Sequence, residues 1–217
     1  MPKLTTPDRV NLNYTDIGSG RPIVMIHGWP LSGAAFADNA TVFAAAGYRV
    51  ITYDRRGFGQ SGKPRDGYDY DTLAADLDAL LTGLDLHDVV LLGFSMGGGE
   101  VARYLATRGS ERVGAAILSG SICPALCITK DNPDGAMPRE GFQELADACA
   151  ADHAGFVDQF CGWFYSNDQG LTVPEEVRRR AVEIARQSAP HAAVATILAW
   201  TEDLREDCRR IDVPLLV

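Results

Sequence analysis

Residues 89–99 read Val-Val-Leu-Leu-Gly-Phe-Ser-Met-Gly-Gly-Gly, and this stretch decides the fold. The apolar run 89–94 predicts a strand that is buried on both faces, as the strands of parallel sheets are. The glycines after it allow a sharp turn into a helix that approaches the sheet closely. A serine centred between glycines at such a strand-to-helix turn is held in a strained backbone that exposes its hydroxyl. The alternative is a serine in an ordinary tight turn, but its place directly after a strand favours Ser95 as a catalytic nucleophile.

Strand-like and helix-like runs alternate on both sides of this stretch, from Arg9 to Ser119. Continuous or alternating apolar runs predict strands, whereas apolar residues repeating every three or four positions predict helices. The regular alternation predicts an α/β fold with a mostly parallel sheet and helices on both faces. The predicted strands are 9–17, 22–26, 48–53, 89–94 and 113–118, and the predicted helices are 34–46, 71–84 and 97–107.

The second chemical signal is His27-Gly28-Trp29-Pro30, directly after the predicted strand 22–26. A tetrahedral oxyanion in acyl transfer needs two backbone N–H donors that point at one place. We expect one from Met96, which follows the nucleophile, and one from Trp29, because Pro30 has no N–H to donate. His27 itself is predicted to be a structural histidine that bonds to the loop backbone.

From residue 120 the sequence predicts a helical cap inserted into the sheet domain. Residues 120–138 are rich in Pro, Gly, Asn and Asp, and residues 139–207 show helical runs but no convincing strand. The expected organisation is a first core part at 1–119, a helical cap at 120–207, and the start of a returning core strand at 208–217. The expected substrate-binding side chains are Trp29, Phe94 and Trp163. The expected cap helices are 139–151, 155–165, 174–187 and 190–203, with Pro174 and Pro190 in first turns.

Composition excludes several other classes of protein. Lys and Arg total 20 against 29 Asp and Glu, so the net charge of −9 disfavours nucleic acid as a partner. The N-terminal residues show no secretory signal, and no apolar run is long enough to span a membrane. Five cysteines without a C-x-x-C pair are expected to be reduced, buried and inert, as in a cytoplasmic protein. Neither a phosphate-binding loop nor a metal-ligand cluster is evident, so no cofactor and no metal are predicted.

Three motifs in order resemble the α/β-hydrolase superfamily: His27–Pro30, the run 53–61 (Tyr-Asp-Arg-Arg-Gly-Phe-Gly-Gln-Ser) and Gly93–Gly99. Within it the chain resembles the cofactor-free bacterial haloperoxidases (non-haem chloroperoxidases), which are serine esterases and perhydrolases. This resemblance implies Ser95 as nucleophile, the Trp29 and Met96 amides as oxyanion hole, and a structural role for residues 54–61. It also implies an Asp and a His beyond Val217, so we expect a C-terminally truncated chain that lacks the last strand and helix.

The resemblance predicts a hydrolase of small carboxylic esters or acids that works through an acyl-enzyme. Water would open that intermediate to an acid, and hydrogen peroxide would open it to a peracid. We expect the 217-residue chain alone to be inactive, because serine is a weak nucleophile without a neighbouring imidazole. The alternatives are a plain carboxylesterase or lactonase, or a catalytically dead member that binds a small molecule. Association into a homo-oligomer is left open.

Overall fold

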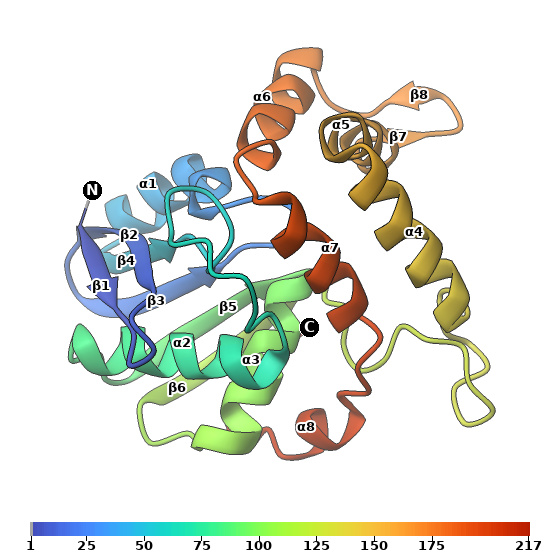
Figure 1. Ribbon diagram of the computed structural model, residues 1–217. Helices are drawn as coiled ribbons and strands as arrows, with labels where there is room; N and C mark the ends of the chain where they lie inside the picture. The colour runs from blue at the N-terminus through green and yellow to red at the C-terminus, as the bar shows by residue number, and fades with distance from the viewer. Residues whose placement is uncertain (1) are drawn as a thin grey trace.

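The computed structural model describes residues 2–217 and has a seven-stranded sheet at its centre (Figure 1). The strand order is β1-β2-β4-β3-β5-β6-β9. The pairs from β4 to β9 are parallel, whereas β1 pairs antiparallel with β2, and β2 antiparallel with β4. The strands of this sheet are β1 (Lys3–Thr5), β2 (Asn11–Gly18), β3 (Arg21–Ile26), β4 (Tyr48–Tyr53), β5 (Val89–Phe94), β6 (Val113–Ser119) and β9 (Leu215–Leu216).

Helices cover both faces of the sheet, as predicted. On one face α2 (Tyr70–Gly83) and α3 (Met96–Arg108) share an apolar cluster with strand residues such as Val24. On the other face α1 (Ala37–Ala45) packs over Ile23 and its neighbours. Successive side chains of a strand point to opposite faces, so β3 is buried on both sides. This burial explains the continuous apolar runs at 23–26 in β3 and 89–92 in β5.

A second group of helices forms a layer beside the sheet (Figure 1). The largest apolar cluster joins this layer to the sheet domain, since it contains Trp29 and Phe58 from the sheet loops together with Phe142 and Trp200 from the helical layer. We call this layer the cap. Its helices are α4 (Arg139–Ala151), α5 (His153–Phe164), α6 (Glu175–Ala185) and α7 (Pro190–Ala199).

The structure corrects the predicted elements at several points. The helix predicted over 34–46 is divided into a 3₁₀ turn, Gly33–Phe36, and α1; the Ser32 hydroxyl accepts from the Ala34 amide at the start of the turn. The prediction that 139–207 holds no strand is wrong, because β7 (Ser166–Asn167) and β8 (Gly170–Leu171) form a short hairpin. Pro190 occupies the first turn of its helix, whereas Pro174 precedes α6 as its N-cap.

Two further elements were not predicted. β1 adds a three-residue strand at one edge of the sheet. α8 (Arg205–Arg209) packs on α3 before the chain enters β9. β9 pairs with β6 at the edge of the sheet, and Leu216 is 63% exposed there.

Candidate active site

Ser95 lies in the sharp turn between β5 and α3. Its φ of 52° and ψ of −118° fall outside the regions that a non-glycine residue ordinarily adopts. Flanking glycines make this turn sterically feasible. An ideal Cβ on Gly93 would lie 2.5 Å from the carbonyl oxygen of Gly97, and one on Gly97 would lie 2.4 Å from that of Ile26. The strained strand-to-helix geometry predicted for Ser95 is therefore present; its role as nucleophile remains a proposal.

The loop after β3 lies directly against this turn. An ideal Cβ on Gly28 would lie 3.1 Å from the Cβ of Ser95, so the two backbones approach as closely as glycine permits. Trp29 is 4% exposed and Met96 is fully buried. Within residues 2–217 neither backbone amide donates a hydrogen bond to another protein group. Buried N–H groups are rarely left unpaired, so two of them beside one serine suit a group that must receive a negative charge.

A mainly apolar pocket opens at Ser95, with about 340 Å³ of empty space including its open mouth. The sheet domain and the cap each supply part of its wall. Trp29 is fixed there because its indole N–H donates to the carbonyl of Ala193 at 3.1 Å. The lining residues are Trp29, Pro30, Leu31, Phe94, Ser95, Phe160, Cys161, Phe164 and Tyr165.

Two of the three side chains predicted to bind substrate, Trp29 and Phe94, line this pocket. Trp163 is not among the lining residues: its side chain is 55% exposed and its ring contacts Phe156 edge-on. Its neighbours on α5, Phe160 and Phe164, line the pocket instead. The sequence offered no signal for this, because the rotation of α5 about its axis is set by packing in the cap.

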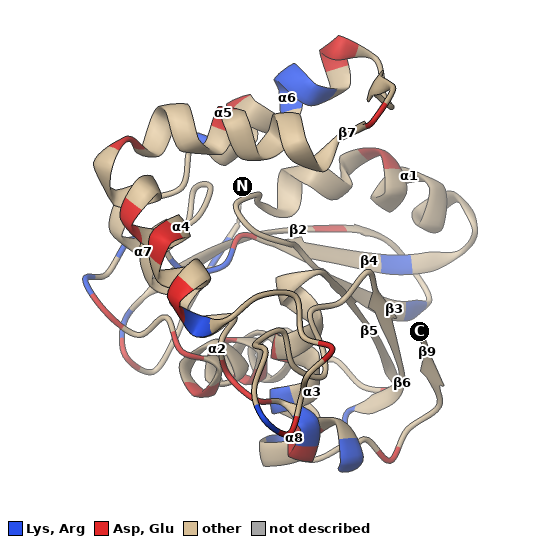
Figure 2. Cartoon of the chain, turned by 90° about the vertical axis from the view of Figure 1, so that its right-hand side faces the viewer, with Lys and Arg blue, Asp and Glu red and all other residues tan. Residues whose placement is uncertain are grey.

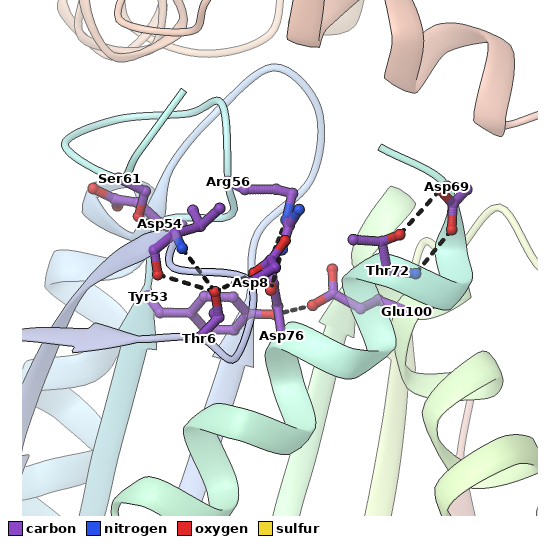
Figure 3. Close-up of polar contacts among 11 residues, drawn as sticks. Thr6, Asp8, Tyr53, Asp54, Arg56, Ser61, Asp69, Thr72, Asp76 and Glu100 are labelled. Atoms are coloured by element: carbon purple, nitrogen blue, oxygen red, sulfur yellow. Dashed lines mark hydrogen bonds and ion pairs between the residues drawn. The ribbon is translucent and has the colours of Figure 1, made fainter. Parts of the chain in front are cut away.

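A buried polar network connects the loop after β3 with helix α3, on either side of Ser95. Arg55 donates through its backbone amide to Nε2 of His27 at 3.0 Å and through its guanidinium to the carbonyl of His27 at 2.9 Å. The same guanidinium pairs with Glu100 on α3 at 2.8 Å, and the Tyr53 hydroxyl donates to the other oxygen of Glu100 (Figure 3). Arg55 and Glu100 are fully buried. The network therefore links the loop that carries Trp29 to the helix that begins at Met96.

Burial shifts the titration of this network. It lowers the pKa of Arg55 to about 10 and raises the pKa of Glu100 well above its usual value. The pKa of His27 lies well below its usual value, first because of burial and then because of the Arg55 charge. A neutral His27 that accepts through Nε2 donates from Nδ1 to the carbonyl of Gly28. The structural interpretation of His27 agrees with these contacts.

The 54–61 loop acts as a brace beside the site. The Asp54 carboxylate accepts from the backbone amides of Gly33 and Gln60 and from the side-chain amide of Asn13. The Ser61 hydroxyl donates to the Asp54 carbonyl (Figure 3). These bonds hold the loop by its own backbone, which agrees with the structural role that the resemblance implied.

No histidine in the described part of the chain is hydrogen-bonded to Ser95. His87 pairs with Asp85, His153 is bonded to the Ser188 hydroxyl at 2.9 Å, and His191 to the Pro64 carbonyl at 2.7 Å. His27 is occupied as described above. All four histidines of the described residues therefore have partners other than Ser95.

The described residues contain neither a group of metal-ligating side chains nor a helix that could cross a membrane. Among residues 2–217 no three His, Cys, Asp or Glu side chains are grouped so that they could hold a metal ion. Over the same residues no helix has the length and apolar character needed to cross a membrane.

Comparisons with known proteins agree with this geometry. A family model described as the alpha/beta hydrolase fold matches residues 21–189. The chain is 42% identical over 219 residues to the non-heme chloroperoxidase CPO-A1 of Kitasatospora aureofaciens, covering all of this chain and 79% of that protein. It is 34% identical over 219 residues to the bifunctional esterase/perhydrolase of Acinetobacter calcoaceticus, covering 99% of this chain and 79% of that one.

A solved structure is similar over nearly the whole chain. The crystal structure of a bromoperoxidase from Bacillus anthracis superimposes with a TM-score of 0.94 at 38% identity. The match covers 99% of this chain and 79% of that one. The overall fold of the described residues therefore agrees with that of a known structure.

Proposed function

The chain belongs to the alpha/beta hydrolase family, and we propose that it is a serine hydrolase that forms an acyl-enzyme on Ser95 from small carboxylic esters or acids. The single observation that carries the proposal is the strained Ser95 beside two buried amides, of Trp29 and Met96, that have no acceptor among residues 2–217. Any helix leaves its first amides free, so the Met96 amide argues for this function through its place beside the strained Ser95 and the unpaired amide of Trp29.

The arrangement supports a two-step reaction. The Ser95 hydroxyl oxygen attacks the substrate carbonyl, and the Trp29 and Met96 amides donate to the oxyanion that develops. The intermediate expels the alcohol or water and leaves an ester on Ser95. A second nucleophile then attacks the same carbonyl and frees the serine. The donors are fixed before substrate arrives, because β5, α3 and the Arg55–Glu100 pair hold the two backbones in place.

The pocket favours a short or flat acyl group. Its walls are mainly aromatic, with Trp29 and Phe94 from the sheet domain and Phe160 and Phe164 from the cap. No Lys, Arg, Asp or Glu is among its lining residues, so a charged acyl chain would lose its hydration without gaining a partner.

We propose hydrogen peroxide as an alternative second nucleophile, which makes the product a peracid. The names of the relatives, a chloroperoxidase and an esterase/perhydrolase, support this extension. Any halide oxidation would follow from the released peracid, so it needs no further group on the protein.

The reaction also needs a general base. No histidine of residues 2–217 is bonded to Ser95, so the test of the proposal has to supply a base together with its carboxylate partner. The rival proposal is a member of the family that binds a small molecule without turning it over. The two differ in whether Ser95 becomes reactive once a base is supplied.

The test is a chimera that joins residues 1–217 to the C-terminal part of the Kitasatospora aureofaciens chloroperoxidase, beginning after its counterpart of Val217. We expect the chimera to hydrolyse a nitrophenyl ester, to form peracetic acid from acetate and peroxide, and to be labelled by a serine-directed phosphonate. Ser95→Ala should lower the turnover by about four orders of magnitude or more and abolish the labelling.

Ser121→Ala is the matched control, since its hydroxyl lies near α3 and accepts from the Cys123 amide but has no role in the proposed reaction. It should keep both activities. A folded chimera that binds ester analogues but is never labelled would support the binding protein instead.

A further inference from the structure

Two connections join the cap to the sheet domain, and each carries a cysteine. The first leaves the end of β6 and contains Cys123; the second passes through α8, which contains Cys208, and returns to β9. The connections already touch, because the Leu204 amide donates to the Pro124 carbonyl at 2.9 Å. Residues far apart in sequence are thus adjacent where the cap meets the sheet domain.

The two thiols lie beside the same backbone contact. The Cys208 amide donates to the Leu204 carbonyl at 2.9 Å, and Leu204 is in turn bonded to Pro124, the neighbour of Cys123. Each thiol shifts the pKa of the other, and both residues are half-buried. The other three cysteines, Cys127, Cys149 and Cys161, are buried. The expectation that all five thiols are buried is therefore wrong for this pair, which is partly accessible.

The two cysteines lie close to the turn that carries Ser95. The amide of Ile122, which precedes Cys123, donates to the carbonyl of Ser95 at 3.3 Å. On the other side, Asp207 is bonded to Arg103 of α3 at 3.0 Å, so α8 is anchored to the helix that begins after Ser95. α8 carries charges of both signs on its outer surface (Figure 2).

The two sulfurs differ in character. The Cys123 thiol lowers the pKa of Cys208 below its usual value, whereas the Cys208 thiol and burial raise the pKa of Cys123. Cys208 therefore has the greater thiolate character and is the better nucleophile toward an oxidant. Cys123 retains its proton and is placed to resolve the oxidised partner.

We propose that Cys123 and Cys208 form a peroxide-sensitive dithiol that closes to a disulfide and ties together the two connections between the cap and the sheet domain. In the first step the Cys208 thiolate attacks one oxygen of hydrogen peroxide, the O–O bond breaks, and the leaving hydroxide takes a proton to give water and a sulfenic acid. In the second step the Cys123 sulfur attacks that of Cys208, and the displaced hydroxide leaves as water with the proton of Cys123. The thiols lose two electrons in total, and one peroxide is reduced to two waters.

The disulfide would change how far the width of the pocket can vary. Its walls come from both parts of the protein, so the position of the cap relative to Ser95 sets its width. A covalent tie between the two connections limits that movement. The oxidant is also the second nucleophile of the proposed function, so a build-up of peroxide would act on the enzyme that consumes it.

The experiment measures thiols rather than turnover, so its failure is distinct from a failure of the proposed function. The reduced 217-residue chain is treated with a small excess of hydrogen peroxide, blocked with N-ethylmaleimide under native conditions, and analysed by intact mass and peptide mapping. We expect the loss of two hydrogens and two blockable thiols, a peptide pair that joins Cys123 to Cys208, and full reversal by dithiothreitol. The melting temperature should rise by about 5 °C or more in the oxidised form.

Variants separate this pair from the other thiols. Cys208→Ser should abolish the bridge and the rise in melting temperature, and Cys123→Ser should stop at the Cys208 sulfenic acid, which dimedone traps. Cys127→Ala, four residues from Cys123 in the same connection, is the matched control and should behave as the unchanged chain. A bridge between other cysteines, or oxidation of Cys208 to higher acids with Cys123 intact, would overturn the proposal.

Discussion

The two walls of the pocket are built in different ways. On the sheet side, Ser95 and the loop at Trp29 are held by strained backbone, by glycines in contact with backbone atoms and by a fully buried ion pair. On the cap side, Phe160 and Phe164 stack on each other at 6.3 Å, and neighbouring residues such as Trp163 are exposed. We call the side with Ser95 and Trp29 the sheet wall and the side with Phe160 and Phe164 the cap wall. The comparison indicates that the sheet wall holds the reacting groups and tolerates few substitutions. The cap wall determines the shape of the pocket and tolerates more of them.

The largest expected effect comes from the ion pair behind the sheet wall. Glu100→Ala leaves the buried Arg55 guanidinium and the Tyr53 hydroxyl without their acceptor. Loss of one partner of a buried pair costs about 3–5 kcal/mol of unfolding free energy. Urea denaturation followed by circular dichroism measures this loss. Asp158→Ala, which removes an exposed partner of Arg178 in the cap, is the control and should have a far smaller effect. Equal losses for the two variants would contradict the comparison.

The second prediction concerns the turn itself. In Gly97→Ala the new Cβ would meet the carbonyl oxygen of Ile26 at 2.4 Å, and a backbone atom cannot swing aside as a side chain can. We expect a destabilisation of about 2–3 kcal/mol, typical of overpacking in a close-packed interior. The same denaturation experiment measures it. An unchanged midpoint would mean that α3 can move away from β3 freely, and that the Met96 amide is not held in place.

The sequence predicted the sheet wall far better than the cap wall. β5 has the predicted bounds, because a strand buried on both faces leaves an unbroken apolar signal. β4 has the predicted bounds as well, although Arg49 and Thr52 interrupt its apolar residues. The strained turn at Ser95 could be predicted because Gly93 and Gly97 stand where a Cβ would collide with backbone atoms, and this need is visible in the sequence. α8 was missed because five largely polar residues give no periodicity, and the β7–β8 hairpin because its strands are two exposed residues each.

The cap side of the pocket could not be predicted for a different reason. Phe160, Trp163 and Phe164 all lie on α5, and only the packing of α5 in the folded cap decides which of them face Ser95. The proximity of Cys123 to Cys208 likewise depends on where two distant connections meet. Such facts belong to the tertiary structure and have no local pattern.

The third prediction uses pH to probe the cap. Burial lowers the pKa of His153 below its usual 6.5, so the folded chain prefers this histidine neutral. The unfolded chain then binds more protons as the pH falls through 6.5, and this contribution to stability is lost toward acid pH. The melting temperature of the unchanged chain should therefore fall more between about pH 7.5 and pH 5 than that of His153→Gln. Glutamine can still bond to the Ser188 hydroxyl, as His153 does at 2.9 Å. Parallel pH profiles would show that His153 is solvated in the folded protein.

The smallest expected effect has the opposite sign and lies in the cap wall. Gly162 is inside α5, next to Cys161 of the pocket, and an ideal Cβ on it would meet no atom within 4 Å. Its φ is not positive, so alanine can adopt the same backbone. Glycine costs a helix interior about 0.5–1 kcal/mol relative to alanine, because its backbone loses more freedom on folding. Gly162→Ala should therefore raise the unfolding free energy by up to about 1 kcal/mol, measured beside Gly97→Ala under the same conditions.

The same chemical change would then stabilise one wall of the pocket and destabilise the other. A loss of stability at Gly162 would mean that the cap is packed as tightly there as the sheet domain is at Ser95, and the distinction between a fixed wall and a variable one would fail.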